Sequence, residues 1–183
     1  LTLNADHTLA GPVTLTGNLA GTGDVTITGG LTWSGGRMAG TGRTILAAGS
    51  INTISSVGQK FVDRILRNAG TVNYTGSGLS FGQNAGVNVY SIENLAGATF
   101  NVTADGDFSQ FNTGTYAFNN AGTFNKTTTA GETLFNTVAF NNTGTVNVDA
   151  GTLNLAGGTN IGTGPFLSAG RYLVANGTTL TFS

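Results

Sequence analysis

The chain has 183 residues, of which only 7 are basic and 8 acidic, and its formal net charge is −1. This balance excludes the clustered Lys and Arg of a nucleic-acid interface, and the lack of Cys excludes disulfides and thiolate metal sites. The 30 Gly do not indicate disorder, because 11 Phe, 4 Tyr and many Val, Ile and Thr supply core-forming side chains.

The N-terminal part predicts short strands, because one phrase recurs there. LAGTGDVTI at residues 19–27 returns as MAGTGRTIL at residues 38–46, a spacing of 19 residues. Apolar and polar residues alternate within each copy, and Gly or Asn follows every ~4–8 positions, which is typical of strands joined by tight turns. The chain already opens on such a stretch, LTLNADHTL. We therefore expect a segment of a much larger repetitive protein that starts without a signal peptide.

The stretch GQKFVDRILRNAG at residues 58–70 departs from this pattern, because four of the eight residues from 60 to 67 are charged. We expect an outward-facing patch or a short loop here, and we leave its coil geometry open. A catalytic base in this stretch is the less favoured alternative. The patch is the first candidate for a partner-binding surface, and its members are Lys60, Asp63, Arg64 and Arg67.

The rest of the chain repeats a different phrase. Thr-apolar-Asn occurs four times, 28, 24 and 22 residues apart and each time shortly after a Gly, beginning at Thr71, Thr99, Thr123 and Thr145. The longest repeat, AFNNAGTFN at residues 117–125, returns as AFNNTGTVN at residues 139–147. A second phrase matches Phe111-Asn112 with Phe135-Asn136. The period thus drifts, as expected when loops vary while strands stay in register.

Repeats of this length cannot bury an apolar face alone, whereas stacked coils bury a continuous one. We therefore predict an all-β fold, a parallel β-solenoid of about eight coils of roughly 19–28 residues, stacked at ~4.8 Å. A β-sandwich is less favoured because its strands do not repeat side chains at the same corner, and a propeller blade needs ~40–45 residues. The predicted ladder comprises inward Phe100, Phe118, Phe124, Phe140 and Val146 with Asn73, Asn101, Asn125 and Asn147.

The corners of such a coil are predicted from the Asn pairs. Asn119 over Asn141, or Asn120 over Asn142, would stack at a corner and hydrogen-bond along the axis. Asn and Gly also tolerate the positive φ angles that sharp corners demand.

Four stretches carry a family resemblance: GLTWSGGRMAGTGRTIL, NNAGTFN, NNTGTVNVDAGTLNLAGGT and AGRYLVANGTTLTF. They resemble the passenger repeats of very large bacterial surface proteins, the filamentous-haemagglutinin-like and autotransporter-type adhesins. The resemblance covers most of the chain but lies in low-complexity phrases, so it indicates a class. It implies a right-handed parallel β-helix that acts as a secreted stalk or adhesive rod.

One pair of carboxylates is local. Asp105 and Asp107, separated by one Gly, are candidate calcium ligands, although a solvated turn is the favoured interpretation. Glu132 lies one coil onward, but the repeat places Asp107 opposite Gly131, so we expect Glu132 to point elsewhere. A glycosidase needs two carboxylates flanking a cleft, and the spacing predicts no such pair.

The remaining candidates are isolated. His7 is the only histidine, so neither a His-based metal site nor a histidine relay can form, and we expect it to be exposed. Trp33 and Tyr74 are candidates for stacking on a sugar ring, although the core is favoured for Trp33. Thr-x-Thr phrases near both ends suggest a remote alternative, an ice-binding array, but Thr-x-Asn replaces them in the middle coils.

We therefore expect residues 1–183 to form one β-solenoid segment of an extracellular bacterial adhesin, structural or adhesive and not enzymatic, without cofactors or catalytic residues. The expected partners are flanking solenoid repeats of the same chain and host surfaces, matrix or glycans. We expect no nucleic-acid partner, and no membrane insertion because no apolar run approaches ~20 residues. The alternative is a carbohydrate-active or carbohydrate-binding β-helix of the lyase or hydrolase type.

Overall fold

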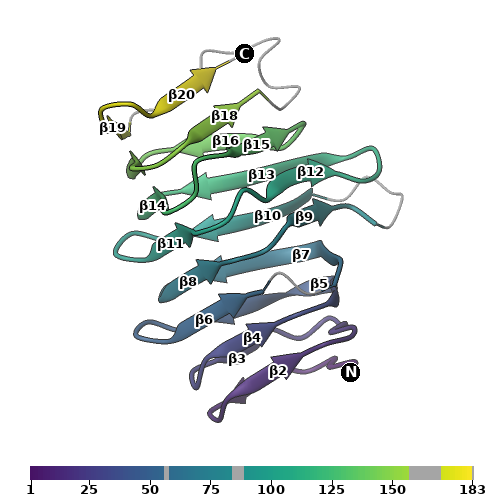
Figure 1. Ribbon diagram of the computed structural model, residues 1–183. Coiled ribbons are helices and arrows are strands. Elements are labelled where there is room, and N and C mark those ends of the chain that lie inside the picture. Colours follow the sequence, from purple (N-terminus) through teal and green to yellow (C-terminus); the bar gives the residue numbers. More distant parts are fainter. Residues whose placement is uncertain (56–57, 84–88, 157–169, 183) are drawn as a thin grey trace.

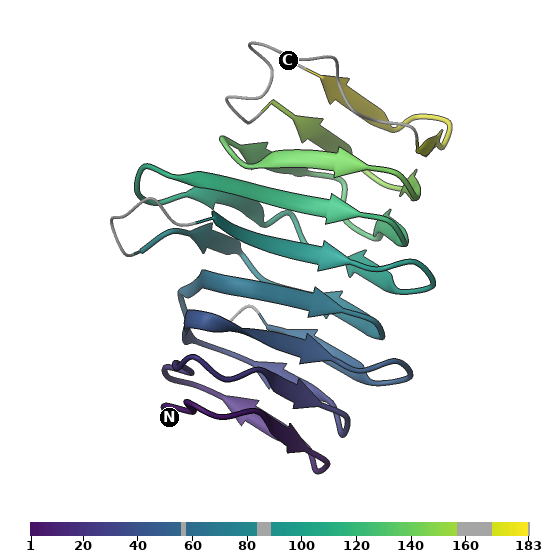
Figure 2. The same ribbon diagram turned by 180° about the vertical axis from the view of Figure 1, so that it is seen from behind.

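The strands stack into an elongated parallel β-solenoid, which confirms the predicted fold class (Figure 1). The computed structural model describes residues 1–55, 58–83, 89–156 and 170–182, and none of these residues is helical. They form a 12-stranded and an 8-stranded sheet. The two ends of the chain lie at opposite ends of the stack, and Figure 2 shows the same stacking from behind.

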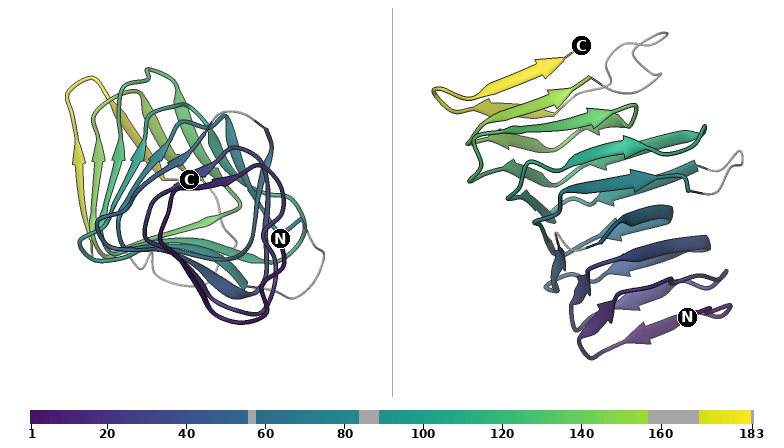
Figure 3. Two further views of the ribbon diagram at one scale, coloured as in Figure 1. Left: turned by 90° about the horizontal axis from the view of Figure 1, so that it is seen from below. Right: turned by 45° about the vertical axis from the view of Figure 1, so that its right-hand side comes forward.

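Each winding passes over three faces, and the 8-stranded sheet forms one of them, here called face A (Figure 3). Its strands pair only in parallel, in the order β2 (Val13–Leu15), β4 (Leu31–Trp33), β6 (Ile51–Ile54), β8 (Thr71–Tyr74), β11 (Thr99–Val102), β14 (Thr123–Lys126), β17 (Thr145–Val148) and β19 (Arg171–Val174).

The 12-stranded sheet covers the other two faces, because β5 (Gly36–Leu46) and β7 (Lys60–Asn68) run around the corner between them. Face B holds the second halves of β5 and β7 together with β1 (His7–Leu9), β3 (Val25–Ile27), β10 (Val89–Asn94), β13 (Thr115–Asn120) and β16 (Ala139–Asn142). Face C holds their first halves and β9 (Gly78–Phe81), β12 (Asp107–Gln110), β15 (Glu132–Asn136), β18 (Thr152–Leu155) and β20 (Thr179–Phe182).

The number of complete coils differs slightly from the expected eight. About 5 turns, from β5 to β17, carry strands on all three faces. The windings before and after them have strands on only one or two faces within the described residues. The drift in coil length comes from the corners, since the strands of face A stay in register.

The predicted repeat is confirmed residue by residue. Thr71 pairs with Thr99, Thr99 with Thr123, and Thr123 with Thr145. The earlier phrase also stacks on its copy, because residues 25–27 pair with residues 44–46. The alternation of apolar and polar residues puts each central apolar residue of Thr-x-Asn into the core, where it is fully buried.

Stacked aromatic rings fill the middle of the core. Phe118 lies over Phe140 with ring centroids 5.5 Å apart, and Phe100 lies over Phe124 at 6.0 Å with an interplanar angle of 4°. Rings from different faces meet edge to face, as Phe118 does with Phe124 at 5.4 Å and 86°. Both arrangements are favoured by the ring quadrupole, so the predicted inward Phe ladder is confirmed.

The predicted match of Phe111 with Phe135 is wrong. Phe108 pairs with Phe135, and their rings stack at 4.3 Å. Residues three apart point to opposite sides of a strand, so only one of Phe108 and Phe111 can face inward. Phe111 instead lies outside, 54% exposed, with its ring edge against Phe61 at 5.3 Å.

Two corner glycines of the Thr-x-Asn repeat, Gly122 and Gly144, serve close approach between windings, whereas Gly97 has the expected positive φ, 82°. Gly122 and Gly144 do not have positive φ, nor do Asn120 and Asn142, so the expected role of left-handed backbone is wrong at these corners. A Cβ atom at Gly144 would collide with the carbonyl oxygen of Gly122 in the adjacent winding. Glycine is needed there because it has no side chain.

Candidate functional site

The charged stretch 60–67 lies within one continuous strand, β7, and most of its charges are inside the fold. Lys60, Asp63 and Arg64 are buried, so the four residues of the predicted patch do not form an exposed surface together. Arg67 is half-buried on face B and forms an ion pair with Glu93, Nε to Oε2 at 2.7 Å. Sequence reasoning placed these residues outside because Lys, Asp and Arg are rarely buried unless paired.

Arg64 holds an irregular corner of the coil. Ala39 pairs with Asp63 and Arg43 pairs with Ile65, so residues 40–42 of β5 face only Arg64. The guanidinium fills this corner and donates hydrogen bonds to the carbonyl oxygens of Gly42 (2.8 Å), Ala39 (3.3 Å), Gly23 (2.9 Å) and Arg43 (2.8 Å).

The electrostatics of this corner is dominated by burial. Burial lowers the pKa of Arg64, and the nearby carboxylate of Asp24 partly opposes this effect. A guanidinium with several carbonyl acceptors is well suited to such a place, because its donors form a rigid planar fork. Arg64 is therefore a structural clamp and is closed to an external ligand.

The neighbouring charged side chains, Asp63 and Lys60, also have partners within the fold. Asp63 Oδ1 accepts a hydrogen bond from the Gln83 backbone N–H at 2.7 Å, and Asp63 Oδ2 lies 3.3 Å from Arg37 Nε. Lys60 Nζ donates to the Gly58 carbonyl at 2.7 Å, and burial lowers the pKa of Lys60. These groups hold the corner in place and do not converge on a common cavity.

The candidate calcium ligands have other partners. Lys126 is fully buried in the inward column of face A, and its Nζ reaches Asp105 Oδ1 at 2.6 Å and Thr129 Oγ1 at 2.6 Å. The hydrogen bonds from Lys126 and Thr129 lower the pKa of Asp105. An ammonium group thus occupies the position beside Asp105 that a bound cation would take. Among the described residues, no group of three or more His, Cys, Asp or Glu could hold a metal ion.

Asp107 and Glu132 point to different partners. Asp107 Oδ1 accepts a hydrogen bond from the backbone N–H of Leu134 at 2.9 Å, so it lies opposite Leu134 and not Gly131 as predicted. Glu132 Oε2 accepts from Asn154 Nδ2 at 3.2 Å. The neighbour differs because Phe108, and not Phe111, pairs with Phe135, which shifts the predicted register by three residues.

The aromatic candidates for sugar stacking are both in the core. Trp33 is fully buried and its Nε1 donates to the Gly35 carbonyl at 2.9 Å. Tyr74 is also fully buried, and burial, followed by the charge of Asp107, raises its pKa. The expectation that these two rings can reach a sugar from the outer wall is therefore wrong, while the favoured core place of Trp33 is confirmed. His7 is exposed on β1, as expected.

The outward ladder of Thr-x-Asn forms as predicted. Asn101 Nδ2 donates to Asn73 Oδ1 at 2.9 Å, Asn125 to Asn101 at 2.8 Å, and Asn147 to Asn125 at 2.7 Å. The same column begins in the N-terminal windings with Thr, since residues 14, 32 and 53 lie in register with Asn73. Beside this column, outward Thr71, Thr99, Thr123 and Thr145 form a second one.

The outer surface of face A is therefore regular and uncharged. The outward positions in the strands from β2 to β17 hold Thr, Asn and a single Ile, and Lys126 in β14 points inward. Charge first returns in β19 with Arg171, which is exposed. Neither an ionic ligand nor a sugar that needs an aromatic platform finds its usual contacts on this wall.

A second Asn ladder, buried and on face B, runs along the corner before face A. Asn68, Asn94, Asn120 and Asn142 stack there, with amide-to-amide distances of 2.7–2.8 Å. Asn119 and Asn141 stack outside on the same strands, Nδ2 to Oδ1 at 2.8 Å. Both of the alternative Asn pairs considered from the sequence therefore exist, one on each side of the strand.

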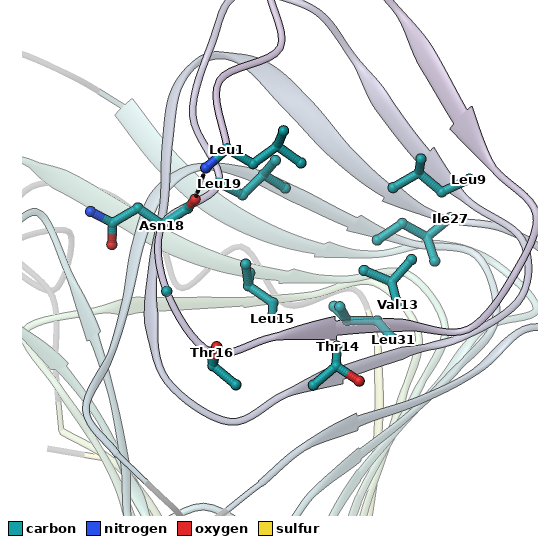
Figure 4. Close-up of a pocket in the computed structure, with 11 residues that line it drawn as sticks. Leu1, Leu9, Val13, Thr14, Leu15, Thr16, Asn18, Leu19, Ile27 and Leu31 are labelled. Atoms are coloured by element: carbon teal, nitrogen blue, oxygen red, sulfur yellow. Dashed lines mark hydrogen bonds between the residues drawn. The ribbon is translucent and has the colours of Figure 1, made fainter.

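A pocket of about 270 Å³ opens at the N-terminal end of the stack (Figure 4). Its walls are apolar side chains of the first windings, which point toward one another across the coil, among them Leu1, Leu9, Val13, Leu15 and Leu19. The N-terminal ammonium donates to the Asn18 carbonyl at 2.8 Å and holds the first residues over the rim. The pocket is the open cross-section of the core and carries no catalytic group.

Comparison with known proteins gives no further guidance: no protein-family model matches the chain, and no curated protein or solved structure is detectably similar to it. Within the described ranges, no helix could span a bilayer by its length and apolar character.

Proposed function

We propose that this chain is a rigid, non-enzymatic rod segment of a bacterial secreted or cell-surface adhesin. The observation that carries the proposal is the unbroken stacking of face A, in which eight parallel strands continue one ladder along the axis. The core beneath it is continuous, and the buried charges are used to hold corners. A stack of this kind is long and stiff, because each winding contacts chiefly the windings directly before and after it.

The chemistry of the carboxylates also favours a structural role. A glycosidase needs a carboxylic acid whose pKa is raised so that it can protonate the leaving group. Asp105 has the opposite property, because Lys126 and Thr129 lower its pKa. Asp63 is buried beside Arg37 and is closed to a substrate.

The proposal is tested by changing the number of windings. Residues 123–144 form one winding, because Thr123 and Thr145 occupy equivalent positions. Inserting extra copies of this 22-residue unit should lengthen the rod by ~4.8 Å per copy, without loss of folding. Electron microscopy would measure the length, and adhesion of beads coated with each variant to matrix proteins and glycans would measure function.

The enzymatic alternative is tested on the same material. Incubation with a panel of neutral and acidic polysaccharides should release neither reducing ends nor unsaturated products. If either product is released, and if the variants with extra windings release it too, a carbohydrate-active β-helix would be favoured over a non-enzymatic rod. Soluble glycans that bind without being cleaved would instead favour the carbohydrate-binding form of that alternative.

A second candidate, ice binding, is favoured by one observation on face A. The Thr-x-Thr phrases do not persist through the middle coils, but the single outward column of Thr14, Thr32 and Thr53 continues in register into the outward Asn ladder. Neutral hydroxyl and amide groups thus repeat along the axis at the strand spacing, ~4.8 Å. Inhibition of ice recrystallisation that Thr99→Tyr abolishes and Asn141→Tyr on face B leaves intact would support it; no inhibition by the native chain would reject it.

A further inference from the structure

We propose that Phe111 is the stacking platform of a binding site for a neutral hexose sugar on the outer side of the coil, next to Gln83 and Asn112. Away from the first and last windings, the large apolar side chains exposed among the described residues are Ile51 and Phe111. Of these two, only Phe111 is aromatic, and it is 54% exposed. The site goes beyond the structural role proposed above and would give the rod the carbohydrate-binding property that was considered there as an alternative.

The ring of Phe111 is held in place by a second ring outside the core. Val62 and Phe81 pair with each other and belong to the core, so Phe61, next to Val62, points outward. Phe61 is nevertheless only 6% exposed, and the Phe111 ring packs on it edge to face, with the centroids 5.3 Å apart and an interplanar angle of 87°. A side chain that is fixed before the ligand arrives loses little conformational entropy on binding.

Two amide side chains lie beside this platform. Asn112 follows Phe111 in the chain, and its Nδ2 donates to the Gln83 carbonyl at 2.7 Å. Gln83 is exposed and is fixed by its backbone N–H, which donates to Asp63 Oδ1 at 2.7 Å, while its Oε1 accepts from Arg37 Nη1 at 3.4 Å. Among the described residues, no group accepts from Gln83 Nε2 or donates to Asn112 Oδ1. One donor and one acceptor are therefore available to hydroxyl groups of a ligand.

The chemistry of the site selects a neutral sugar. A pyranose ring has a face of C–H groups, which packs on an aromatic ring, and hydroxyl groups at its rim, which bond to amides. The two charged side chains that bond to Gln83 also pair with each other, Arg37 Nε to Asp63 Oδ2 at 3.3 Å, so an acidic or basic ligand gains no counter-charge from them. A protein partner is disfavoured, because one half-exposed ring among polar groups is far smaller than an interface that buries ~800 Å² on each side.

The experiment measures oligosaccharide binding to the 183-residue chain by calorimetry and saturation-transfer NMR. The neutral probes are cellotetraose, maltotetraose and N-acetylchitotetraose, and the acidic probe is tetragalacturonate. Phe111→Ala removes the platform, Phe111→Trp keeps it, and Gln83→Leu removes one amide at similar side-chain size. Ile51→Ala is the matched control, because it removes the other exposed apolar group of the side wall. Melting followed by circular dichroism shows which variants are folded.

We expect the native chain to bind at least one neutral probe with a Kd on the order of 1 mM, with saturation transferred to the C–H protons of one sugar face. Phe111→Ala should weaken this binding by about tenfold or more, and Gln83→Leu by about threefold or more. Phe111→Trp and Ile51→Ala should bind like the native chain. If Phe111→Ala does not fold, Gln83→Leu carries the test.

The site would be overturned by a native chain that binds none of the neutral probes, by binding of the acidic probe alone, or by binding that survives removal of the platform or, where that variant is unfolded, of the Gln83 amide. The variants with extra windings copied from residues 123–144 leave residues 61–112 unchanged and should bind the probes like the native chain. A failed sugar site therefore leaves the rod proposal standing, and rods that fail to lengthen leave the sugar site standing.

Discussion

Asn120 lies directly over Asn142 in the stack, and its Nδ2 donates to Asn142 Oδ1 at 2.8 Å and to the Thr145 carbonyl at 3.1 Å. Asn94 binds Asn120 and the Thr123 carbonyl in the same way, at 2.7 and 3.1 Å. Each buried amide therefore ties one winding to the next at the corner before face A. The amide also gives a partner to a backbone carbonyl at the start of face A.

Replacing Asn120 with Asp should lower the free energy of unfolding by about 2–4 kcal/mol at neutral pH, because a buried carboxylate cannot donate to either oxygen. Urea denaturation measures the change. Asn73→Asp is the matched control: its Oδ1 accepts from Asn101 Nδ2 on the outer side, where a carboxylate still accepts, and its other neighbour in register is the neutral Thr53. We expect a change within about 0.5 kcal/mol for this control. Equal effects of the two variants would contradict the buried ladder.

The aromatic core gives a second prediction. Phe118 is fully buried and its ring contacts Phe100, Phe124 and Phe140. Phe118→Ala should lower the free energy of unfolding by about 3–5 kcal/mol, because it removes buried surface and leaves a cavity. Phe111→Ala, on the outside of the coil, should cost only about 1 kcal/mol or less. A near-neutral Phe118→Ala would mean that this ring is not part of the packed core.

The Thr-x-Asn windings could be predicted from the sequence because each repeat meets the same neighbours above and below. Identical side chains one period apart then become direct contacts, and the register follows from the intervals. Both Asn pairs on β13 and β16 could be recognised for the same reason. The sequence did not decide between them, and the structure contains both.

The departures arise where register and burial depend on non-repeating residues. Phe108 and Phe111 are each followed by a polar residue, so only the strand position decides which ring faces inward. The burial of Arg64 depends on the extra residues 40–42 of β5, because only after the windings are stacked do the carbonyls of Gly42, its neighbours Ala39 and Arg43, and Gly23 surround the guanidinium. Neither effect has a signal in local sequence pattern.

The clamp at Arg64 gives a third prediction. Arg64→Met should lower the free energy of unfolding by about 3 kcal/mol or more, because several buried carbonyl groups would lose their donors at once. Arg64→Lys should restore little of this, since an ammonium cannot reproduce the planar fork. The control is Arg43→Met, whose exposed ion pair with Asp24 has a long N–O distance of 3.8 Å and is worth about 0.5 kcal/mol. Thermal and urea unfolding that rank Arg43 above Arg64 would contradict the clamp.

The ion pair between Lys126 and Asp105 predicts a pH dependence. Lys126 and Thr129 lower the pKa of Asp105 in the folded state. The ionised carboxylate of Asp105 therefore contributes its full stabilisation above the unfolded pKa of ~3.9. This stabilisation is lost as pH falls through the lower folded pKa. The carboxylate is 38% exposed, so solvent screens the pair and the effect is modest. The free energy of unfolding should therefore contain an Asp105-dependent decline below pH ~4.

Two substitutions isolate this pair. Asp105→Asn should lower the free energy of unfolding by about 1–2 kcal/mol at neutral pH, because Lys126 keeps its bond to Thr129 but loses its counter-charge. This deficit should shrink toward zero as pH falls below the folded pKa of Asp105, since the native carboxyl is then neutral as well. The double variant Asp105→Asn, Lys126→Met should be neutral or stabilising relative to Asp105→Asn alone, because it also removes the buried charge that the single substitution leaves without its counter-charge. Urea unfolding from pH 7 to strongly acidic conditions provides the comparison, and a deficit of Asp105→Asn that stays constant with pH would show that the pair makes no electrostatic contribution to folding.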